Sequence, residues 1–325
     1  MKTFAYYIPG RVEECSDWLS ALLLCLAAGR SGAQQQWGRA ECAGPLSVVT
    51  NGTRAEWQVV TSAGARGVAA GGRALSIAHN DRAYLVGACA QGDSFGPAMF
   101  SSNFKLLGQA LNFTVDLSTA GCACNVAFYM VSMPGLDANG NPDPGEGDGY
   151  CDANDVDSQW CPEMDILEAN TAALAVTPHT CSPPDEKGHY SACDKGGCSV
   201  NPHKSSPTLF GPGAGFTVDT TRPFSVLTAF PTDPATGNLA SVTTTVAQGA
   251  ASFVLSHTDA TCGAGYLAAM TAPLAAGMVP AISVWGDSGQ TMSWLDVPPC
   301  SLAASCADAT AQGVFSDFSI SPLAP

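Results

Sequence analysis

Three carboxylates fall within six residues in the segment Glu163-Met-Asp165-Ile-Leu-Glu168, which otherwise has the apolar composition of a buried strand. Alternate residues of a strand point to the same face, so Glu163 and Asp165 share a face. Glu168 has the wrong parity, and it joins them only if the strand carries a bulge or ends after Ile166. Three acids on one face predict that at least one of them has a raised pKa.

A raised carboxyl group beside an ionised one is what glycoside hydrolysis requires. One group donates a proton, and the other acts as nucleophile or base. A solvated acidic edge and a calcium-binding cluster are the alternatives, and spacing alone does not decide among the three.

The composition limits the class of protein. The chain has 325 residues, enough for one large all-β domain or two smaller ones, and no linker divides it. It carries 28 acidic and 13 basic residues, with a formal net charge of −15. This charge argues against binding a polyanion such as nucleic acid.

The N-terminal part resembles an export signal. The apolar segment 18–28 is shorter than the roughly 20 residues that span a bilayer, and small residues follow it up to Ala33. We therefore expect residues 1–33 to be a signal peptide and Gln34 to begin a secreted, extracellular protein without a membrane segment. The region before Trp18 is long and acidic for such a signal, which is also compatible with a start codon further in.

The cysteines agree with export. Two of the 14, Cys15 and Cys25, lie in the leader, and an even twelve remain. Six disulfides are the natural interpretation, since no C-x-x-C pair or histidine cluster supports a metal site. No cofactor or metal is therefore predicted. Asn51-Gly-Thr53 and Asn112-Phe-Thr114 fit the N-glycosylation pattern.

After the leader, short β-rich runs alternate with turns, and no sustained helical period is present. The sequence thus predicts an all-β fold in a single domain, 34–325, built as a sandwich of two sheets. A short helix is expected within the Ala-rich segment 266–278. The expected strands include 113–117, 216–219, 224–230, 239–246 and 314–320.

The segment 137–148 carries oxygen ligands at alternate positions, as calcium loops do. Pro142 stands where an EF-hand loop needs glycine, and no helices flank the segment. We expect a solvated turn rather than a calcium site.

Several motifs together carry a family resemblance. Glu163-Met-Asp-Ile-Leu-Glu-Ala-Asn170, followed by Thr177-Pro-His179-Thr-Cys181, closely resembles the catalytic strand of glycoside hydrolase family 7, the cellobiohydrolases and endo-β-1,4-glucanases. The resemblance covers roughly residue 68 to the C-terminus, in the family's order. The further matching segments are 104–109, 129–133, 149–152, 211–213, 283–287 and 294–296.

The resemblance implies a concanavalin-like β-jelly-roll of two curved antiparallel sheets, whose concave face binds a glycan, and hydrolysis with retention of configuration. Glu163 matches the family's nucleophile and Glu168 its general acid/base. Asp165 would hold and tune Glu163, and His179 matches a family histidine near the acid/base, although a lone histidine is more often structural.

Other residues match positions that line the family's cleft. Trp285 and Trp294 resemble the aromatic platforms on either side of the scissile bond, whereas a core position is the alternative for both. Asn154 stands where the family commonly has glutamine. The remaining predicted substrate-binding residues are Asn125, Tyr129 and Asp152.

The family's disulfide pattern also transfers to this chain. It pairs Cys151 with Cys161, Cys181 with Cys193, and Cys198 with Cys262, and it joins Cys122 to Cys300 or Cys306. The family does not place Cys42, Cys89 and Cys124, but Cys42 with Cys89, and Cys124 with the remaining C-terminal cysteine, would complete the set.

Departures from the family favour its endoglucanase branch. The long insertion between Cys151 and Cys161 is nearly gone, product-site arginines are missing, and Leu167 stands where cellobiohydrolases have tryptophan. Trp57 is either a remnant platform or a core residue. Fewer roofing loops predict an open cleft and internal cleavage.

We therefore predict a secreted, monomeric, retaining endo-β-1,4-glucanase that acts on cellulose or a related β-glucan. The alternatives are a cellobiohydrolase acting from chain ends, a β-1,3(4)-glucanase, and a glycan-binding sandwich without catalysis. Three buried acids argue against the last of these.

Overall fold

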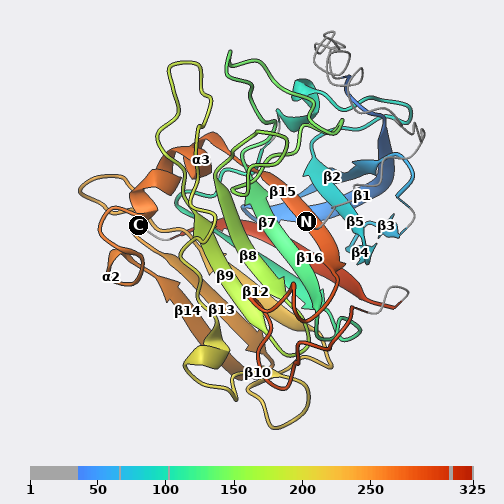
Figure 1. The fold of residues 1–325 in the computed structure, drawn as a ribbon, viewed down its shortest axis with the longest axis vertical. Helices are drawn as coiled ribbons and strands as arrows, with labels where there is room; N and C mark the ends of the chain where they lie inside the picture. Colours follow the sequence, from blue (N-terminus) through green and yellow to red (C-terminus); the bar gives the residue numbers. More distant parts are fainter. Residues whose placement is uncertain (1–35, 66, 102, 307–309, 324–325) are drawn as a thin grey trace, which may run out of the picture. The chain divides into compact units, whose positions relative to one another are not determined.

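The computed structural model describes residues 36–325, except 66, 102, 307–309 and 324–325. The predicted signal peptide, 1–33, lies outside the described residues. In the described part, strands predominate (Figure 1). They are β1 (Ala40–Thr50), β2 (Thr53–Ser62), β3 (Val68–Ala70), β4 (Ala74–Ala78), β5 (Asp81–Val86), β6 (Gln109–Asp116), β7 (Cys124–Val131), β8 (Glu163–Ala169), β9 (Leu174–His179), β10 (Phe210–Gly211), β11 (Val218–Asp219), β12 (Phe224–Ala229), β13 (Val242–Gln248), β14 (Ala251–His257), β15 (Val279–Gly286) and β16 (Gln312–Pro322).

One hydrogen-bonded path connects most of these strands. Its order is β14-β13-β12-β6-β16-β1-β2-β5-β15-β7-β8-β9, with β4 pairing to β16, and β3 to β4. The short pair of β10 and β11 forms a separate parallel sheet. Within the large sheet β1 and β16 pair in parallel, so the expectation of purely antiparallel sheets is wrong at this junction.

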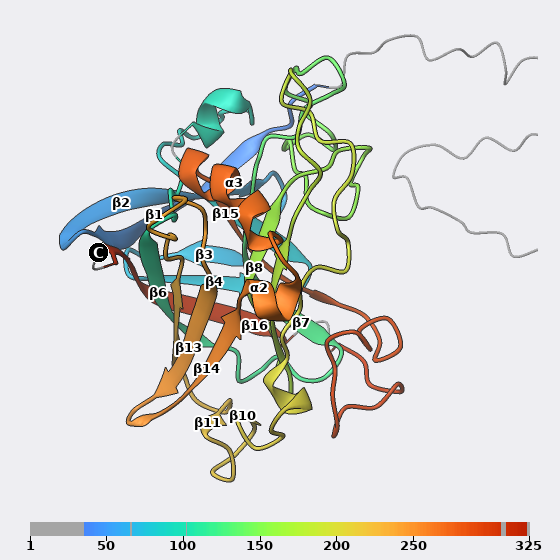
Figure 2. The same cartoon turned by 90° about the vertical axis from the view of Figure 1, so that its left-hand side faces the viewer.

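The large sheet curls until its two halves face each other, as the two layers in Figure 2 show. Phe113 on β6 and Phe128 on β7 have ring centroids 4.7 Å apart, although five strands separate them along the hydrogen-bonded path. These rings lie in the main hydrophobic core, which therefore fills the space between the layers. The predicted β-sandwich is confirmed, with its two layers continuous through β1 and β2.

Strand burial shows which face each layer offers. In β12 and β13 buried residues alternate with half-buried or exposed ones, as expected of a layer with one face on the core and one outward. In β7 every residue is buried. Phe128 of β7 points into the main core, while Tyr129 belongs to a second cluster on the concave side. Both faces of β7 are thus buried.

Most expected elements appear near their predicted bounds. β6, β12, β13 and β16 confirm four predicted strands, whereas segment 216–219 contributes only the two residues of β11. The Ala-rich segment forms the 3-10 turn η3 (Leu267–Met270) and helix α3 (Thr271–Ala276). The other short helical segments are η1 (Pro97–Phe100), η2 (Pro202–Lys204) and α2 (Asp259–Cys262). No helix of the described residues is long and apolar enough to cross a membrane.

The twelve cysteines of the described part form six disulfides, as predicted. Cys122 pairs with Cys300 and Cys124 with Cys306, so two disulfides tie the chain just after Trp294 to the start of β7. The other four are Cys42–Cys89, Cys151–Cys161, Cys181–Cys193 and Cys198–Cys262.

The acidic loop 137–148 is a network of turns. The carboxylate of Asp137 accepts backbone N–H groups from Asn139 and Asn141 at 2.8 and 2.9 Å, and these bonds lower its pKa. An aspartate that caps its own turn in this way needs no ion to explain it. The solvated-turn interpretation accounts for this loop.

Candidate active site

A bulge in β8 brings the three acids to one face. Asp165 pairs with Tyr129 of β7, and Glu168 pairs with Ala127, two residues further along the same strand. Three residues on β8 therefore span two on β7, and the pairing with β9 shifts at the same point. Glu163, Asp165 and Glu168 thus occupy successive rows of the concave face, which confirms the bulge expected from their parity.

The same bulge satisfies the core. Met164, Ile166 and Leu167 are all fully buried in the main hydrophobic cluster. Without the extra residue, either Leu167 or Glu168 would face the wrong side. Apolar burial on one face and acid placement on the other therefore favour the same irregular backbone.

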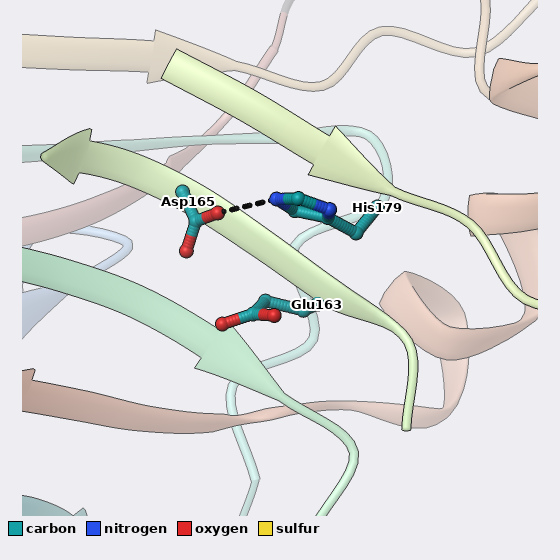
Figure 3. A group of neighbouring side chains, drawn as sticks. All are labelled: Glu163, Asp165 and His179. Carbon is teal, nitrogen blue, oxygen red and sulfur yellow. Dashed lines mark ion pairs between the residues drawn. The ribbon is translucent and has the colours of Figure 1, made fainter. Parts of the chain in front are cut away.

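Glu163 and Asp165 are adjacent buried acids (Figure 3). Burial raises the pKa of Glu163 well above its usual range, and the negative charges of Asp165 and Asp152 raise it further. Burial and Asp152 likewise raise the pKa of Asp165, which shares a side-chain hydrogen bond with Glu163. The backbone N–H of Ala153 donates to Oε2 of Glu163 at 3.0 Å and favours the ionised form of that carboxyl.

His179, at the end of β9, connects to Asp165. Its Nε2 lies 3.0 Å from Oδ2 of Asp165, and its Nδ1 lies 2.8 Å from the backbone carbonyl oxygen of Asp194. A carbonyl oxygen only accepts, so Nδ1 carries a hydrogen and the contact with Asp165 places a second proton between Nε2 and the carboxylate. Figure 3 shows the ring directed at Asp165 rather than at Glu163.

Glu168 is half-buried and has a different environment. Burial raises its pKa well above the usual range, and the charge of Asp165 adds to this. The side-chain amide of Asn125 donates to its Oε1 at 2.9 Å and acts in the opposite direction. Asn125 is itself fully buried and is not among the residues that line the cleft; its side-chain contact is with Glu168.

Tyrosines and a further aspartate adjoin Glu163. The hydroxyl of Tyr150 donates to Asp152 at 2.8 Å and lies 3.2 Å from that of Tyr129. Burial raises the pKa of Tyr129 to about 12. These hydroxyl groups therefore keep their protons near neutral pH and can serve as hydrogen-bond donors.

The acids lie in a cleft of about 1110 Å³ on the concave face. Nearly all of the predicted site residues line it together. They are Glu163, Asp165, Glu168, His179, Tyr129, Asp152, Asn154, Trp285 and Trp294.

The cleft also contains residues that the sequence did not single out. Arg82 lies with its guanidinium carbon 3.7 Å from the ring centroid of Tyr150 and pairs with Asp148 at 3.4 Å. Tyr84 donates to the same Asp148 at 2.7 Å. The alternation of Arg82 and Tyr84 on one face of β5 was the available signal, but their partner is distant in sequence.

Asn154 lies at the lip, in the short loop between Cys151 and Cys161. It is exposed, and its carbonyl oxygen accepts a hydrogen bond from Lys195 at 3.2 Å. The ammonium group of Lys195 also lies 4.9 Å from the ring centroid of Trp160. This contact anchors the loop at its outer side, while the backbone N–H of Asn154 donates to Oδ1 of Asp152 at 2.6 Å.

The two indoles stack on each other. Trp285 and Trp294 have ring centroids 6.1 Å apart and an interplanar angle of 23°, and they are 40% and 46% exposed. The core interpretation of these tryptophans is therefore wrong. Trp57, in contrast, packs edge-on against Phe104 beside the main core.

Glu163, Asp165 and His179 also have the composition of a metal site, since one ligand atom of each lies within 4.8 Å of the others. The hydrogen-bonded contacts of Asp165 with Glu163 and His179 already account for this proximity. We therefore interpret the cluster as three side chains that share protons, and no bound ion is needed to explain their proximity.

Comparison with known proteins gives consistent matches. The family model for glycosyl hydrolase family 7 matches residues 157–262. The chain is 37% identical over 230 residues to endoglucanase EG-1 of Trichoderma longibrachiatum, which covers 61% of this chain and 47% of the relative. It is 34% identical over 246 residues to an endo-beta-1,4-glucanase, celB, of Emericella nidulans, covering 59% and 57%. The chain thus spans about half the length of the curated relatives it matches.

Solved structures share the fold over nearly the whole chain. An endoglucanase I complexed with cellobiose superposes with a TM-score of 0.67 at 20% identity, covering 90% of this chain and 98% of that one. A family 7 cellobiohydrolase from Daphnia pulex gives a TM-score of 0.63 at 19% identity, covering 91% and 98%. The chain thus resembles glycosyl hydrolase family 7 in the matched segment and in these relatives, and it shares the β-jelly-roll fold of the solved structures.

Proposed function

We propose that this protein is a secreted, monomeric endo-β-1,4-glucanase that cleaves cellulose or a related β-glucan with retention of configuration. The observation that carries the proposal is the bulge in β8, which aligns Glu163 and Glu168 on one concave face with Asp165 between them. A retaining enzyme needs two carboxyls on one side of the cleft, about 5 to 5.5 Å apart.

Glu168 is suited to be the general acid. Its raised pKa favours the protonated form that a general acid needs, and it is the more exposed of the two glutamates. The amide of Asn125 holds Oε1, which leaves the other oxygen to give its proton to the glycosidic oxygen.

Glu163 is suited to be the nucleophile once its neighbours carry the protons. The N–H of Ala153 fixes one of its oxygens, and Asp165 can donate to the other. Protonated His179 then donates from Nε2 to Asp165 while Nδ1 remains bound to Asp194. In this arrangement the negative charge stays on Glu163 and two protons lie on the row beside it.

The reaction follows from these roles. The carboxylate of Glu163 attacks the anomeric carbon while Glu168 protonates the departing oxygen, which gives a glycosyl ester on Glu163. Glu168, now ionised, takes a proton from water, and the resulting hydroxide attacks the anomeric carbon and releases Glu163. Two inversions give net retention.

The substrate would lie along the open cleft. Indoles offer large apolar surfaces for the C–H faces of sugar rings, so Trp285 and Trp294 are proposed as the stacking residues. Tyr129, Asp152 and Asn154 are proposed to bind hydroxyl groups nearby. Endo action is supported by the loop closed by Cys151–Cys161, which spans only 10 residues and leaves the cleft without a long cover.

The test compares Glu163→Gln with the parent on carboxymethyl cellulose, mixed-linkage glucan and laminarin. Viscosity and reducing ends are followed together, and the anomer released first is identified by NMR. We expect a rapid viscosity loss and the β-anomer from the parent on the first two substrates, and no turnover but intact binding by the variant. Glu56→Gln, an exposed acid outside the cleft, is the control.

The alternatives give different results in the same experiment. Cellobiose with slow viscosity loss would indicate a chain-end enzyme, and activity on laminarin alone would indicate a β-1,3-glucanase. Unchanged turnover by Glu163→Gln would overturn the assignment of the nucleophile.

A further inference from the structure

The outward face of β6, β12, β13 and β14 is unusual for a protein of such high net charge. Asn112, Leu227, Thr245 and Val254 lie opposite one another in a single row across the four strands. The flanking rows hold only Ser, Thr and Ala at outward positions, so three successive rows contain no charged side chain.

This face is also apolar at two exposed points. Leu227 is 40% exposed and Val254 is 57% exposed, and they are two of the five large apolar residues that the described part exposes. Trp285 and Trp294 lie in the cleft, so their exposure serves the substrate. Leu227 and Val254 have no such use.

The face ends at an open edge. β14 is the last strand of the hydrogen-bonded path, and its outward residues Ser252, Val254 and Ser256 are exposed. Natural sheets usually protect such edges with charges, proline or a cover, because an uncharged edge rich in β-branched residues invites pairing with another chain. Strands β12, β13 and β14 contain no Asp, Glu, Lys or Arg residue and no proline.

The row of Asn112, Leu227, Thr245 and Val254 contains an N-glycosylation motif, and a glycan attached there could cover the apolar residues. Asn112 begins the sequence Asn112-Phe-Thr114, in which Phe113 is fully buried while Asn112 and Thr114 are half-buried on the outward side. Asn112 lies three strand spacings from Val254, about 14 Å at 4.7–4.9 Å per strand. A branched oligosaccharide of several hexoses is long enough to lie over Leu227 and Val254.

We propose that Asn112 carries an N-linked glycan that covers the row of Leu227, Thr245 and Val254 and keeps the β14 edge from pairing with a second copy of the chain. The sugar C–H faces would contact the two apolar side chains, and the hydroxyl groups would face water. The proposal requires export through a compartment that transfers such glycans, but it does not depend on the catalytic assignment.

The covalent step is a group transfer from a lipid-linked oligosaccharide. The Nδ2 atom of Asn112 bonds to the anomeric carbon of the sugar and loses one proton, and the polyisoprenyl diphosphate leaves from that carbon. No oxidation occurs. Transfer takes place on the extended chain, before Asn112 joins the sheet, so its half-buried final position is no obstacle.

The test begins with the full chain secreted from yeast. Peptide mapping after enzymatic deglycosylation in ¹⁸O-water measures occupancy at Asn112 and, in the same digest, at Asn51. We expect Asn112 to be occupied. An unmodified Asn112 in the secreted protein would overturn the proposal, whatever is found at Asn51.

The second measurement is the association state by light scattering over a concentration series. We expect Asn112→Gln and Thr114→Ala, which both destroy the sequence motif, to associate at concentrations at least tenfold lower than the parent. Thr114→Ser keeps the motif and should behave as the parent does. Asn51→Gln removes the other motif, at the β1–β2 turn, and should also leave the association state unchanged.

A rescue experiment distinguishes loss of the glycan that covers Leu227 and Val254 from a general loss of solubility on deglycosylation. Adding Leu227→Thr and Val254→Thr to Asn112→Gln should restore the monomer, because the apolar points that require the glycan are removed. An aglycosylated protein that stays monomeric at all concentrations, or a triple variant that associates as strongly as Asn112→Gln, would overturn the proposed cover.

Discussion

The Nδ1 atom of His179 donates to the carbonyl oxygen of Asp194 at 2.8 Å, while its Nε2 lies 3.0 Å from Asp165. The first contact fixes the tautomer of the second. With Nδ1 committed to a carbonyl, any proton in the contact between Nε2 and Asp165 is shared by these two groups, next to the buried carboxyl of Glu163.

His179→Ala should therefore lower kcat by roughly 10²-fold, the lower end of the contribution of a positioned acid or base. The physical reason is that Asp165 loses the partner that compensates its charge, so Glu163 is less easily held as the ionised nucleophile. Steady-state rates on a soluble β-glucan across pH measure this effect. A variant with a raised KM and an unchanged kcat would show that His179 contributes only to binding.

Gly197 should be required for the placement of His179. Its φ of +58° suits glycine, and an added Cβ would come within 2.7 Å of Nδ1 of His179 and 2.5 Å of a methyl carbon of Thr177. We expect Gly197→Ala to lower kcat at least tenfold, because a displaced His179 loses its contact with Asp165. Gly196→Ala is the control, since its Cβ would meet only Asp194 Oδ1 at 3.5 Å. Equal activity of the two variants would contradict this prediction.

Asn125→Leu should raise the pKa of Glu168 further, because the amide that favours its ionised form is removed while the volume is kept. The limb of the kcat profile on the alkaline side reports the loss of the proton of the general acid, so it should move to higher pH. The rate at the optimum should fall, since Glu168 is no longer oriented. Asn125→Asp should move the limb in the same direction, and an unmoved limb in both variants would exclude contact of Asn125 with the acid/base in the working enzyme.

The irregular strand at the centre of the site could be predicted from the sequence. The parity of Glu168 conflicts with that of Glu163 and Asp165, and a bulge is the smallest change that resolves the conflict while burying Ile166 and Leu167. A local pattern was sufficient because one face of the strand must carry the acids while the other must carry the buried apolar residues. The family resemblance gave three disulfide pairs, Cys151–Cys161, Cys181–Cys193 and Cys198–Cys262, and these are confirmed. It left the partner of Cys122 open between Cys300 and Cys306, and the structure pairs Cys122 with Cys300.

Contacts between distant segments could not be predicted. Arg82 and Asp148 are 66 positions apart, and nothing in either segment marks the other as its partner. The burial of Asn125 likewise depends on tertiary packing, since its strand position faces the concave side and only the surrounding structure closes it from the cleft. The stacking of Trp285 on Trp294 depends on a segment tied down by two disulfides to β7. Whether a residue is buried or exposed therefore depends on such packing between distant segments and not on its neighbours in the sequence.

Glu163→Gln should stabilise the protein at neutral pH even though it abolishes turnover. In the folded protein burial and neighbouring acids raise the pKa of Glu163, whereas in the unfolded chain the pKa returns to about 4.3. The folded state therefore binds the proton more strongly, and stability falls as pH rises from the unfolded pKa through the raised folded pKa.

Gln keeps an acceptor for the N–H of Ala153 but has no charge to bury. The free energy of unfolding in urea should then exceed that of the parent at pH 7, by about 1.4 kcal/mol for each unit of pKa shift, and the difference should vanish near pH 4. Glu56→Gln, at an exposed position, should show no such dependence. A Glu163→Gln variant that is less stable than the parent at pH 7 would mean that Glu163 is held by compensating contacts and is not destabilised by its burial.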